Sequence, residues 1–255
     1  MTLVWRPGFQ FDADASTYIE AVEAADTQAL ETGVRYAIND FVIGCKQDGI
    51  WSAIKASCIL AGARTTNGAL VPLVGTAPTP NNFDLVGDTD YDRKTGLVGN
   101  GSNKYLISNR NSNSDPQNSQ HMAVYKTAGS GNGNLIGQSG SPIARDLIDY
   151  NSQWRFNSRS TLSVNNAAAV TTNGFIGLSR SSSSTIYTRI GGAIASQLVG
   201  SSAPDAIPIY VFSRGVNDFP TASRLSFYSI GESLDLALLD TRVSNLMTAI
   251  GAAIP

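Results

Sequence analysis

The chain has 255 residues, of which 42% are hydrophobic and only 15% are charged, and its formal net charge is −2. A chain of this length can bury a sizeable core in one domain and carry a smaller appendage. The slight negative charge argues against nucleic-acid binding, which needs Lys and Arg clustered on one face. The sequence has no run of about 18 apolar residues, so no membrane span is expected.

The N-terminal residues lack the basic stretch and the apolar run of a signal peptide. We therefore expect synthesis in a cytoplasm, with any later export occurring by lysis or within a particle. Few charges combined with many Ser, Thr, Asn and Gly residues suit an extracellular or virion surface.

Residues 1–67 are predicted to form an arm followed by helices. Tyr18 and Val22 begin an apolar stripe at helical spacing, in a segment rich in acids. A second helix is expected over 33–46. A third, short helix is expected over 50–62, where apolar residues repeat every four positions.

From residue 68 the apolar period changes to two, and turn residues recur about every ten positions. This rhythm predicts a mainly β fold over 68–232, an antiparallel jelly-roll β-sandwich. A C-terminal helix over 233–255 should pack on the sandwich, with Ser233 as its N-cap and Gly251 as its stop. The candidate strands are Ala69–Val74, Lys104–Ser108, Met122–Thr127, Leu147–Tyr150, Gln153–Asn157, Thr161–Val164, Phe175–Leu178, Thr185–Ile190, Ile209–Phe212 and Arg224–Ile230.

Two features of the β region have a structural and a ligand-binding interpretation. Trp154 shares a strand face with Phe156, which favours a core position over a platform for sugar stacking. The Asn-rich stretch Asn100–Gln120 is expected to be an ordered surface loop, because Asn and Ser side chains satisfy loop backbone; a ligand-binding loop is the alternative.

The single histidine and the two cysteines do not form a recognisable catalytic or metal-binding motif. His121 is the only histidine, and no nucleophile elbow accompanies it, so we interpret it as a polar residue that opens a strand. Replacing it by Ala should leave function intact if the fold is preserved. Cys45 and Cys58 are expected to lie buried in helices as small apolar residues, and they are too few for a zinc site with one histidine.

The acids Asp88, Asp90 and Asp92 are the one cluster with the spacing that glycan cleavage or metal binding requires. A glycosidase needs two carboxylates held a fixed distance apart, but this cluster lies in a turn beside basic residues, so we expect no enzyme. An EF-hand would need Gly and Glu where the chain has Arg93 and Gly99. A lectin-type calcium site at the three aspartates is the remaining cofactor prediction.

The N-terminal arm is too apolar for a free tail. Trp5, Phe9 and Phe11 surround Arg6-Pro7-Gly8, which suits an arm laid across a partner. We predict that this arm and the helical segment make the main contact with neighbouring subunits of a homo-oligomer. The alternative is that arm and helices cap their own sandwich.

Several segments resemble known proteins. The β segments are Thr161-Leu-Ser-Val-Asn-Asn166, Gly174-Phe-Ile-Gly-Leu-Ser-Arg180, Tyr187-Thr-Arg-Ile-Gly-Gly192, Pro208-Ile-Tyr-Val-Phe-Ser213 and Arg224-Leu-Ser-Phe-Tyr-Ser-Ile-Gly231. They resemble concanavalin A-like/laminin-G-like jelly-rolls. The opening Ile43–Lys55, the following Gly62–Thr65 and the ending Ser229–Asp240 resemble bacteriophage tail and other virion structural proteins.

The resemblance implies a fold and a particle, but no site. It favours a non-enzymatic virion protein of a bacteriophage, either a tail or baseplate component or a head decoration. Such a protein would bind other virion proteins and contact host surface polysaccharide. A lectin-like carbohydrate-binding module is the alternative, and a glycan depolymerase dependent on Asp88, Asp90 or Asp92 is the third hypothesis.

Overall fold

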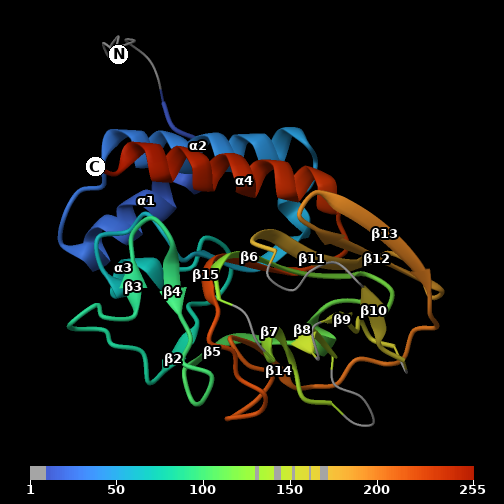
Figure 1. The fold of residues 1–255 in the computed structure, drawn as a ribbon. Coiled ribbons are helices and arrows are strands. Elements are labelled where there is room, and N and C mark those ends of the chain that lie inside the picture. The colour runs from blue at the N-terminus through green and yellow to red at the C-terminus, as the bar shows by residue number, and fades with distance from the viewer. Residues whose placement is uncertain (1–9, 130–131, 141–144, 151–152, 161, 167–171) are drawn as a thin grey trace.

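The computed structural model describes residues 10–129, 132–140, 145–150, 153–160, 162–166 and 172–255. These residues form three layers, namely a layer of helices and two antiparallel sheets (Figure 1). The helices cover one face of the first sheet, called sheet A here. The other face of sheet A packs on the second sheet, sheet B. The fold is therefore mainly β, a sandwich of two antiparallel sheets, as predicted.

Sheet A is eight-stranded, in the order β13-β12-β11-β6-β15-β4-β3, with β1 pairing to β15 beside β4. Its central strands β6 and β15 are long, and nearly all of their residues are buried on both faces. The bounds are β1 Ile54–Ile59, β3 Tyr91–Asp92, β4 Gly96–Val98, β6 Gln120–Ala128, β11 Gly174–Arg180, β12 Thr185–Ile190, β13 Ala193–Leu198 and β15 Arg224–Gly231.

Sheet B is seven-stranded, in the order β10-β9-β8-β7-β14-β5-β2. All of its described pairings are antiparallel. The bounds are β2 Thr79–Asn81, β5 Tyr105–Asn111, β7 Gly133–Gln138, β8 Arg145–Tyr150, β9 Gln153–Phe156, β10 Val164–Asn166 and β14 Pro208–Val211.

Aspartate side chains cap the N-termini of α1 and α4. Asp12 accepts a hydrogen bond from the Asp14 backbone N–H at the start of α1, and Asp235 accepts from two backbone N–H groups at the start of α4. None of the helices in the described part of the chain combines the length and apolarity needed to cross a membrane. The bounds are α1 Ala13–Asp26, α2 Thr32–Gln47, α3 Thr66–Ala69 and α4 Leu236–Ala253, with 3₁₀ turns η1 Trp51–Ala53 and η2 Ser112–Ser114.

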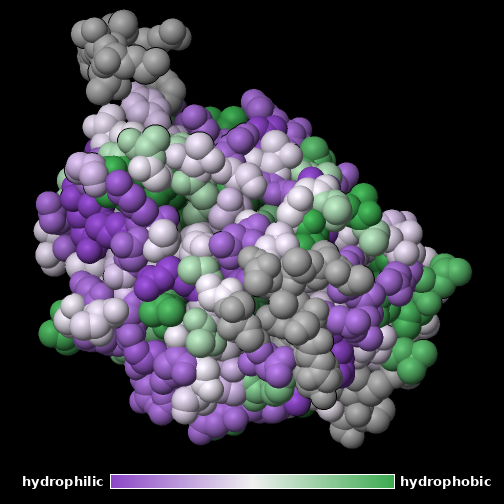
Figure 2. Space-filling view, in the orientation of Figure 1, coloured by the Kyte–Doolittle hydropathy of each residue, from purple (hydrophilic) through white to green (hydrophobic). Residues whose placement is uncertain are grey.

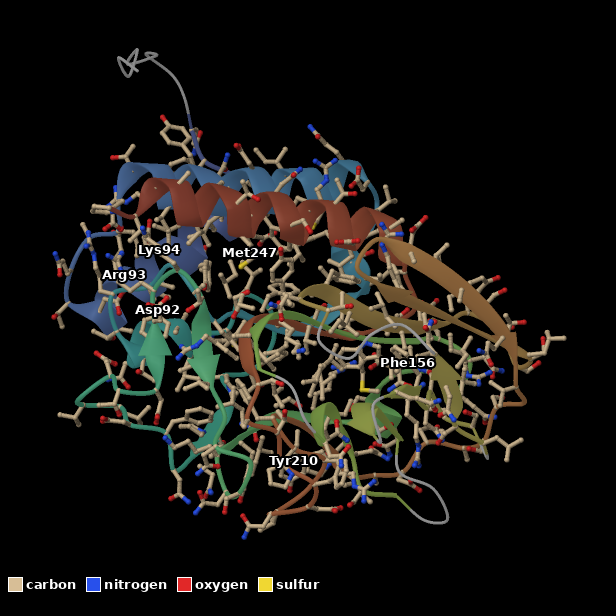
Figure 3. The ribbon with its side chains drawn as sticks, in the orientation of Figure 1. Asp92, Arg93, Lys94, Phe156, Tyr210 and Met247 are labelled. Carbon is tan, nitrogen blue, oxygen red and sulfur yellow. The ribbon has the colours of Figure 1, made fainter. Side chains whose placement is uncertain are left out.

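Two apolar cores hold the layers together. Between the sheets, Trp154 and Phe156 are fully buried, which confirms the core position predicted for Trp154. Between helices and sheet A, the rings of Phe41 and Phe227 meet edge-on at 5.7 Å. Figure 3 shows Met247 projecting from α4 toward sheet A and Phe156 lying between the sheets.

The predicted third helix is wrong, because residues 54–59 form strand β1. Ile54 and Cys58 are four apart, and this even spacing places them on one face of a strand as well as of a helix. The polar residues Lys55 and Ser57 alternate with these apolar ones, which a strand explains, but Ser57 is buried like its neighbours. Both cysteines are buried and free, but Cys58 lies on this strand and only Cys45 on a helix.

Most other predicted elements are shifted at their ends by a few residues, and three differ in kind or in what ends them. Residues 69–74 contain the end of α3 and a turn, with a single bridge from Val74 to β1 in place of a strand. β10 begins at Val164, and residues 162 and 163 are not strand, while Thr161, where the predicted strand begins, lies outside the described residues. α4 begins at Leu236, because Asp235 caps it, and it continues through Gly251 to Ala253.

The apolar stripes of α1 and α2 are buried within the chain itself. Val22, Val34 and Ile38 belong to the core between the helical layer and sheet A. The helices therefore cap their own sandwich, as the alternative had it, and a contact of this segment with a neighbouring subunit stays a prediction.

Candidate functional site

The three predicted metal ligands do not converge. Each of the carboxylates of Asp88, Asp90 and Asp92 accepts hydrogen bonds from a different part of the loop region. Within the described ranges, no group of three or more His, Cys, Asp or Glu side chains could hold a metal ion. The donors are the backbone N–H and hydroxyl of Thr66 for Asp88, the Lys104 ammonium and Asp84 N–H for Asp90, and the N–H groups of Lys94 and Thr95 for Asp92.

An ion pair of Arg93, next to these aspartates, holds their loop against the helical layer. The Arg93 guanidinium donates to both carboxylate oxygens of Glu31, at 3.0 and 2.6 Å. A hydrogen bond from Thr95 lowers the pKa of Asp92. Asp92, Arg93 and Lys94 lie together at the end of the molecule far from Phe156 (Figure 3). These charged side chains thus stabilise the loop rather than form a pocket.

His121 lies inside the fold at the start of β6. Its side chain is fully buried, with Nδ1 2.5 Å from the Glu232 carbonyl oxygen and Nε2 2.7 Å from the Ser229 hydroxyl. Burial lowers the pKa of His121 to about 4. The imidazole is therefore neutral near neutral pH and tethers β6 to the chain that leads into α4.

The predicted assembly residues lie only partly within the described chain. Trp5 and Phe9 are outside the described residues. Phe11 packs against α2, where its ring meets that of Tyr36 edge-on at 5.4 Å. An assembly role for the three aromatic residues stays a prediction.

The Asn-rich stretch is ordered by its own side chains, as expected for a structural loop. Oδ1 of Asn100 accepts from three backbone N–H groups, those of residues 102, 103 and 104, at 2.9 to 3.0 Å. Part of the stretch is strand rather than loop, because β5 runs through to Asn111.

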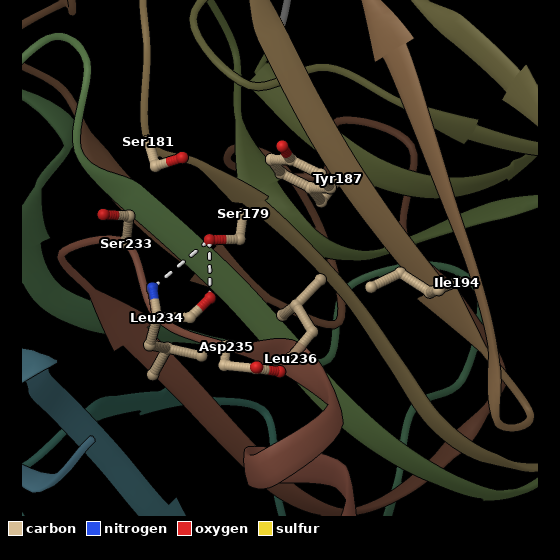
Figure 4. A pocket seen from close by; sticks show the side chains of 8 residues that line it. All are labelled: Ser179, Ser181, Tyr187, Ile194, Ser233, Leu234, Asp235 and Leu236. Carbon is tan, nitrogen blue, oxygen red and sulfur yellow. Dashed lines mark hydrogen bonds between the residues drawn. The ribbon is translucent and has the colours of Figure 1, made fainter. Parts of the chain in front are cut away.

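A hollow of about 370 Å³ lies where α4 begins above strands β11 to β13. The helical layer ends here, so α4 covers only part of the outer face of β12 and leaves that of β13 exposed. Figure 4 shows Tyr187 and Ile194 facing the chain that enters α4. The lining residues are Ser179, Ser181, Tyr187, Ile194, Ser233, Leu234, Asp235 and Leu236.

Strand alternation places the aromatic ring in this hollow. On β12, residues 186 and 188 point into the sandwich, so Tyr187 points outward and is 39% exposed. Its neighbour across the ladder on β11 is Ser179, whose hydroxyl donates to the Leu234 carbonyl at 3.0 Å and accepts from the Leu234 N–H. The hydroxyl thereby fixes the loop that forms the opposite wall (Figure 4).

An ion pair fixes α4 to β12 beside the hollow. Nε of Arg189 lies 2.6 Å from Oδ2 of Asp240, and both side chains are largely buried. Arg189 follows Tyr187 on the same strand face. Asp235 lies at the rim and adds a carboxylate to the hollow. Its Oδ1 accepts a hydrogen bond from the Ala237 backbone N–H at 2.7 Å. The hollow is therefore lined by an aromatic ring, several hydroxyl groups and one carboxylate, which strands β11 to β13 and the start of α4 hold in place.

No protein-family model matches the sequence, and no curated protein sequence matches it. The fold is similar to the botulinum neurotoxin serotype D binding domain, with a TM-score of 0.51 and 12% identity over 76% of this chain. The chain spans about half of that structure's length, 51% of it. At this identity the likeness establishes the fold alone.

Two other solved structures are less similar. Trypanosoma rangeli sialidase in complex with sialic acid gives a TM-score of 0.48 and 12% identity, over 76% of this chain and 33% of the other. Domain 4 of an extracellular arabinanase from Geobacillus stearothermophilus, in complex with arabinotriose, gives a TM-score of 0.41 and 12% identity, over 66% of this chain and 82% of the other.

Sequence reasoning missed the hollow. The alternation in Thr185–Ile190 could have marked Tyr187 as outward-facing, since Ile186 and Ile190 occupy the opposite face. No local pattern reveals that Asp235, some fifty positions later, lies beside the same strands.

Proposed function

We propose that this protein is a non-enzymatic structural protein of a bacteriophage particle that binds a surface glycan in the hollow at Tyr187. The observation that carries the glycan part is an exposed aromatic ring within a hydroxyl-rich hollow on a lectin-like sandwich. A sugar ring presents an apolar C–H face that suits an aromatic ring, and hydroxyls that pair with serine and carboxylate oxygens. The Asp235 charge favours neutral over anionic sugars.

The particle context rests on the sequence. The segments Ile43–Lys55 and Ser229–Asp240 resemble those of phage virion proteins, and the content of charged residues, 15%, is low. Under this proposal the protein is made in the host cytoplasm, assembles with other virion proteins and resides in the virion. Mass spectrometry of purified particles, with heads separated from tails, tests it; absence of its peptides from both fractions contradicts the proposal.

The non-enzymatic part is supported by how the candidate catalytic groups are used. His121 and the carboxylates of Asp88, Asp90 and Asp92 are engaged in hydrogen bonds that hold the fold. We expect no reducing ends to appear when the protein is incubated with host polysaccharide. Release of reducing ends that is lost on replacing one of the three aspartates would instead support a depolymerase.

The glycan site is tested with an array of bacterial surface glycans, followed by titration of the best-bound oligosaccharide. Tyr187→Ala should weaken binding about tenfold or more, equivalent to 1.4 kcal/mol, because the stacking face is lost. Tyr187→Phe keeps that face and should bind nearly as the wild type. Val86→Ala, at a residue 96% exposed on a distant loop, is the matched control. Equal binding by Tyr187→Ala and wild type, or retention by no glycan on the array, overturns the proposal.

A further inference from the structure

Strand β13 ends sheet A and exposes apolar side chains there. Among the described residues, β12 is the only strand that pairs with it. Ile194 is 57% exposed and Leu198 is 87% exposed. Figure 2 shows hydrophobic residues gathered at the same end of the molecule where Figure 1 places β13.

The backbone of β13 offers hydrogen-bonding groups to a further strand. The N–H of Val199 donates to the Ser184 carbonyl at 2.9 Å, in register with the β12–β13 ladder. Antiparallel ladders alternate hydrogen-bonded and non-hydrogen-bonded pairs, so Ile194, Ser196 and Leu198 belong to the non-bonded set. Their N–H and C=O groups therefore point away from β12, toward the open edge.

The edge formed by β13 lacks the features that normally prevent an edge strand from pairing with another chain. Proteins usually protect an edge strand with charged side chains, Pro or a bulge. Residues 191–203 contain no charged residue and no Pro, and β13 pairs with β12 without a register shift. The backbone and side chains of β13 therefore leave this edge open to pairing with a further strand.

We infer that a second copy of this chain pairs with β13, antiparallel and about a two-fold axis at Ser196. In this register Ser196 faces the partner's Ser196, and Ile194 faces the partner's Leu198. Apolar side chains then meet apolar ones on the outer face, and no like charges face one another. The two copies of sheet A become one continuous sheet.

The self-complementary pattern is what selects a second copy over an unrelated strand. A symmetric pair needs each residue to suit its counterpart across the axis, and the sequence Ile194-Ala-Ser-Gln-Leu198 satisfies this about its central Ser196. Ile194 also lines the hollow described above, so the partner's Leu198 would extend the hollow's apolar wall. The pairing itself does not depend on the proposed glycan binding.

The test uses the full chain in sedimentation velocity. We expect the wild type to sediment as a species of twice 26.9 kDa at low micromolar concentration. Ser196→Lys places two ammonium groups against each other at the axis and should raise the dimer dissociation constant at least about a hundredfold. Val86→Lys makes a similar change at another exposed site and should remain dimeric. Circular dichroism and thermal melting establish that each variant is folded.

A second pair of variants tests the register. Ser196→Asp should also be monomeric, and mixing it with Ser196→Lys should restore a dimer containing one copy of each. A monomeric wild type overturns the inference. So do a Ser196→Lys protein that dimerises as the wild type does, which places the contact elsewhere, and a mixture that stays monomeric, which points to a different partner strand.

Discussion

Acidification should destabilise this fold through its single histidine. In the folded state His121 is buried and neutral, since burial lowers its pKa from 6.5 to about 4. In the unfolded chain the imidazole is solvated and takes up a proton near pH 6.5. The unfolded state therefore binds more protons than the folded state between these values, and stability falls as the pH drops through this window.

The size of the effect follows from the two pKa values. Between pH 8 and pH 5, the free energy of unfolding should decrease by about 2 kcal/mol, and the decrease should continue until about pH 4. Asp12, Asp48 and Asp92 have pKa values below their normal value of 3.8, so the stability that they contribute is lost only at lower pH. The change in the free energy of unfolding between pH 5 and 6.5 is therefore attributed mainly to His121. Guanidinium titrations at several pH values in this interval measure the slope of that free energy against pH.

The variant His121→Gln is the control, because its amide can bond the same partners and carries no proton in this range. It should be less stable than the wild type at pH 8, and its free energy of unfolding should be flat between pH 6.5 and 5. An equal slope in both proteins, or a wild type that is equally stable at pH 8 and pH 5, refutes the argument from burial.

Three further substitutions test the core and the backbone, each by guanidinium unfolding followed by circular dichroism. Trp154→Ala should cost about 3–5 kcal/mol, since the indole fills the core between the sheets, and Trp154→Phe should cost less. Arg180→Met removes a buried guanidinium that donates to three backbone carbonyl oxygens and should cost about 3 kcal/mol; a neutral effect contradicts this. Gly96→Ala should cost at least about 2 kcal/mol, because φ is +95° and a Cβ would lie 2.1 Å from the Leu225 carbonyl oxygen. Gly251→Ala, a helical position with open space, should cost nothing, and similar losses at both glycines would refute the steric argument.

Alternation of the two faces makes some strands plain in the sequence, and the nearly buried strands β6 and β15 are predicted as well, but other buried segments give no signal. Strand β12 alternates, with Ile186 and Ile190 inward, and its predicted bounds match the structure. Strand β7, Gly133–Gln138, is buried at every position, so no period distinguishes it from a loop rich in Gly and Asn. β1 is missed for another reason, because the spacing of four between Ile54 and Cys58 fits one face of a helix as well as one face of a strand.

The candidate site was beyond sequence reasoning because it depends on tertiary packing. Tyr187 and Asp235 meet only because α4 returns over β11 and β12, where Gly177 lets Leu236 approach the sheet closely. The cluster of three aspartates attracted attention through its spacing, yet each carboxylate bonds a different donor. Spacing along a turn does not determine where side chains point.

The pairing of β1 with β15 has a consequence for how the chain folds during synthesis. Residues 54–59 find their partner strand only at 224–231, and α2 packs on α4, which follows still later. At about 5–20 residues per second, roughly 10 to 30 seconds separate the translation of the two strands. Until β15 and α4 have been made, the core between the first two helices and sheet A is incomplete, so the nascent chain should engage a ribosome-associated chaperone. A transcript truncated before α4 should give an aggregating product rather than a smaller folded domain.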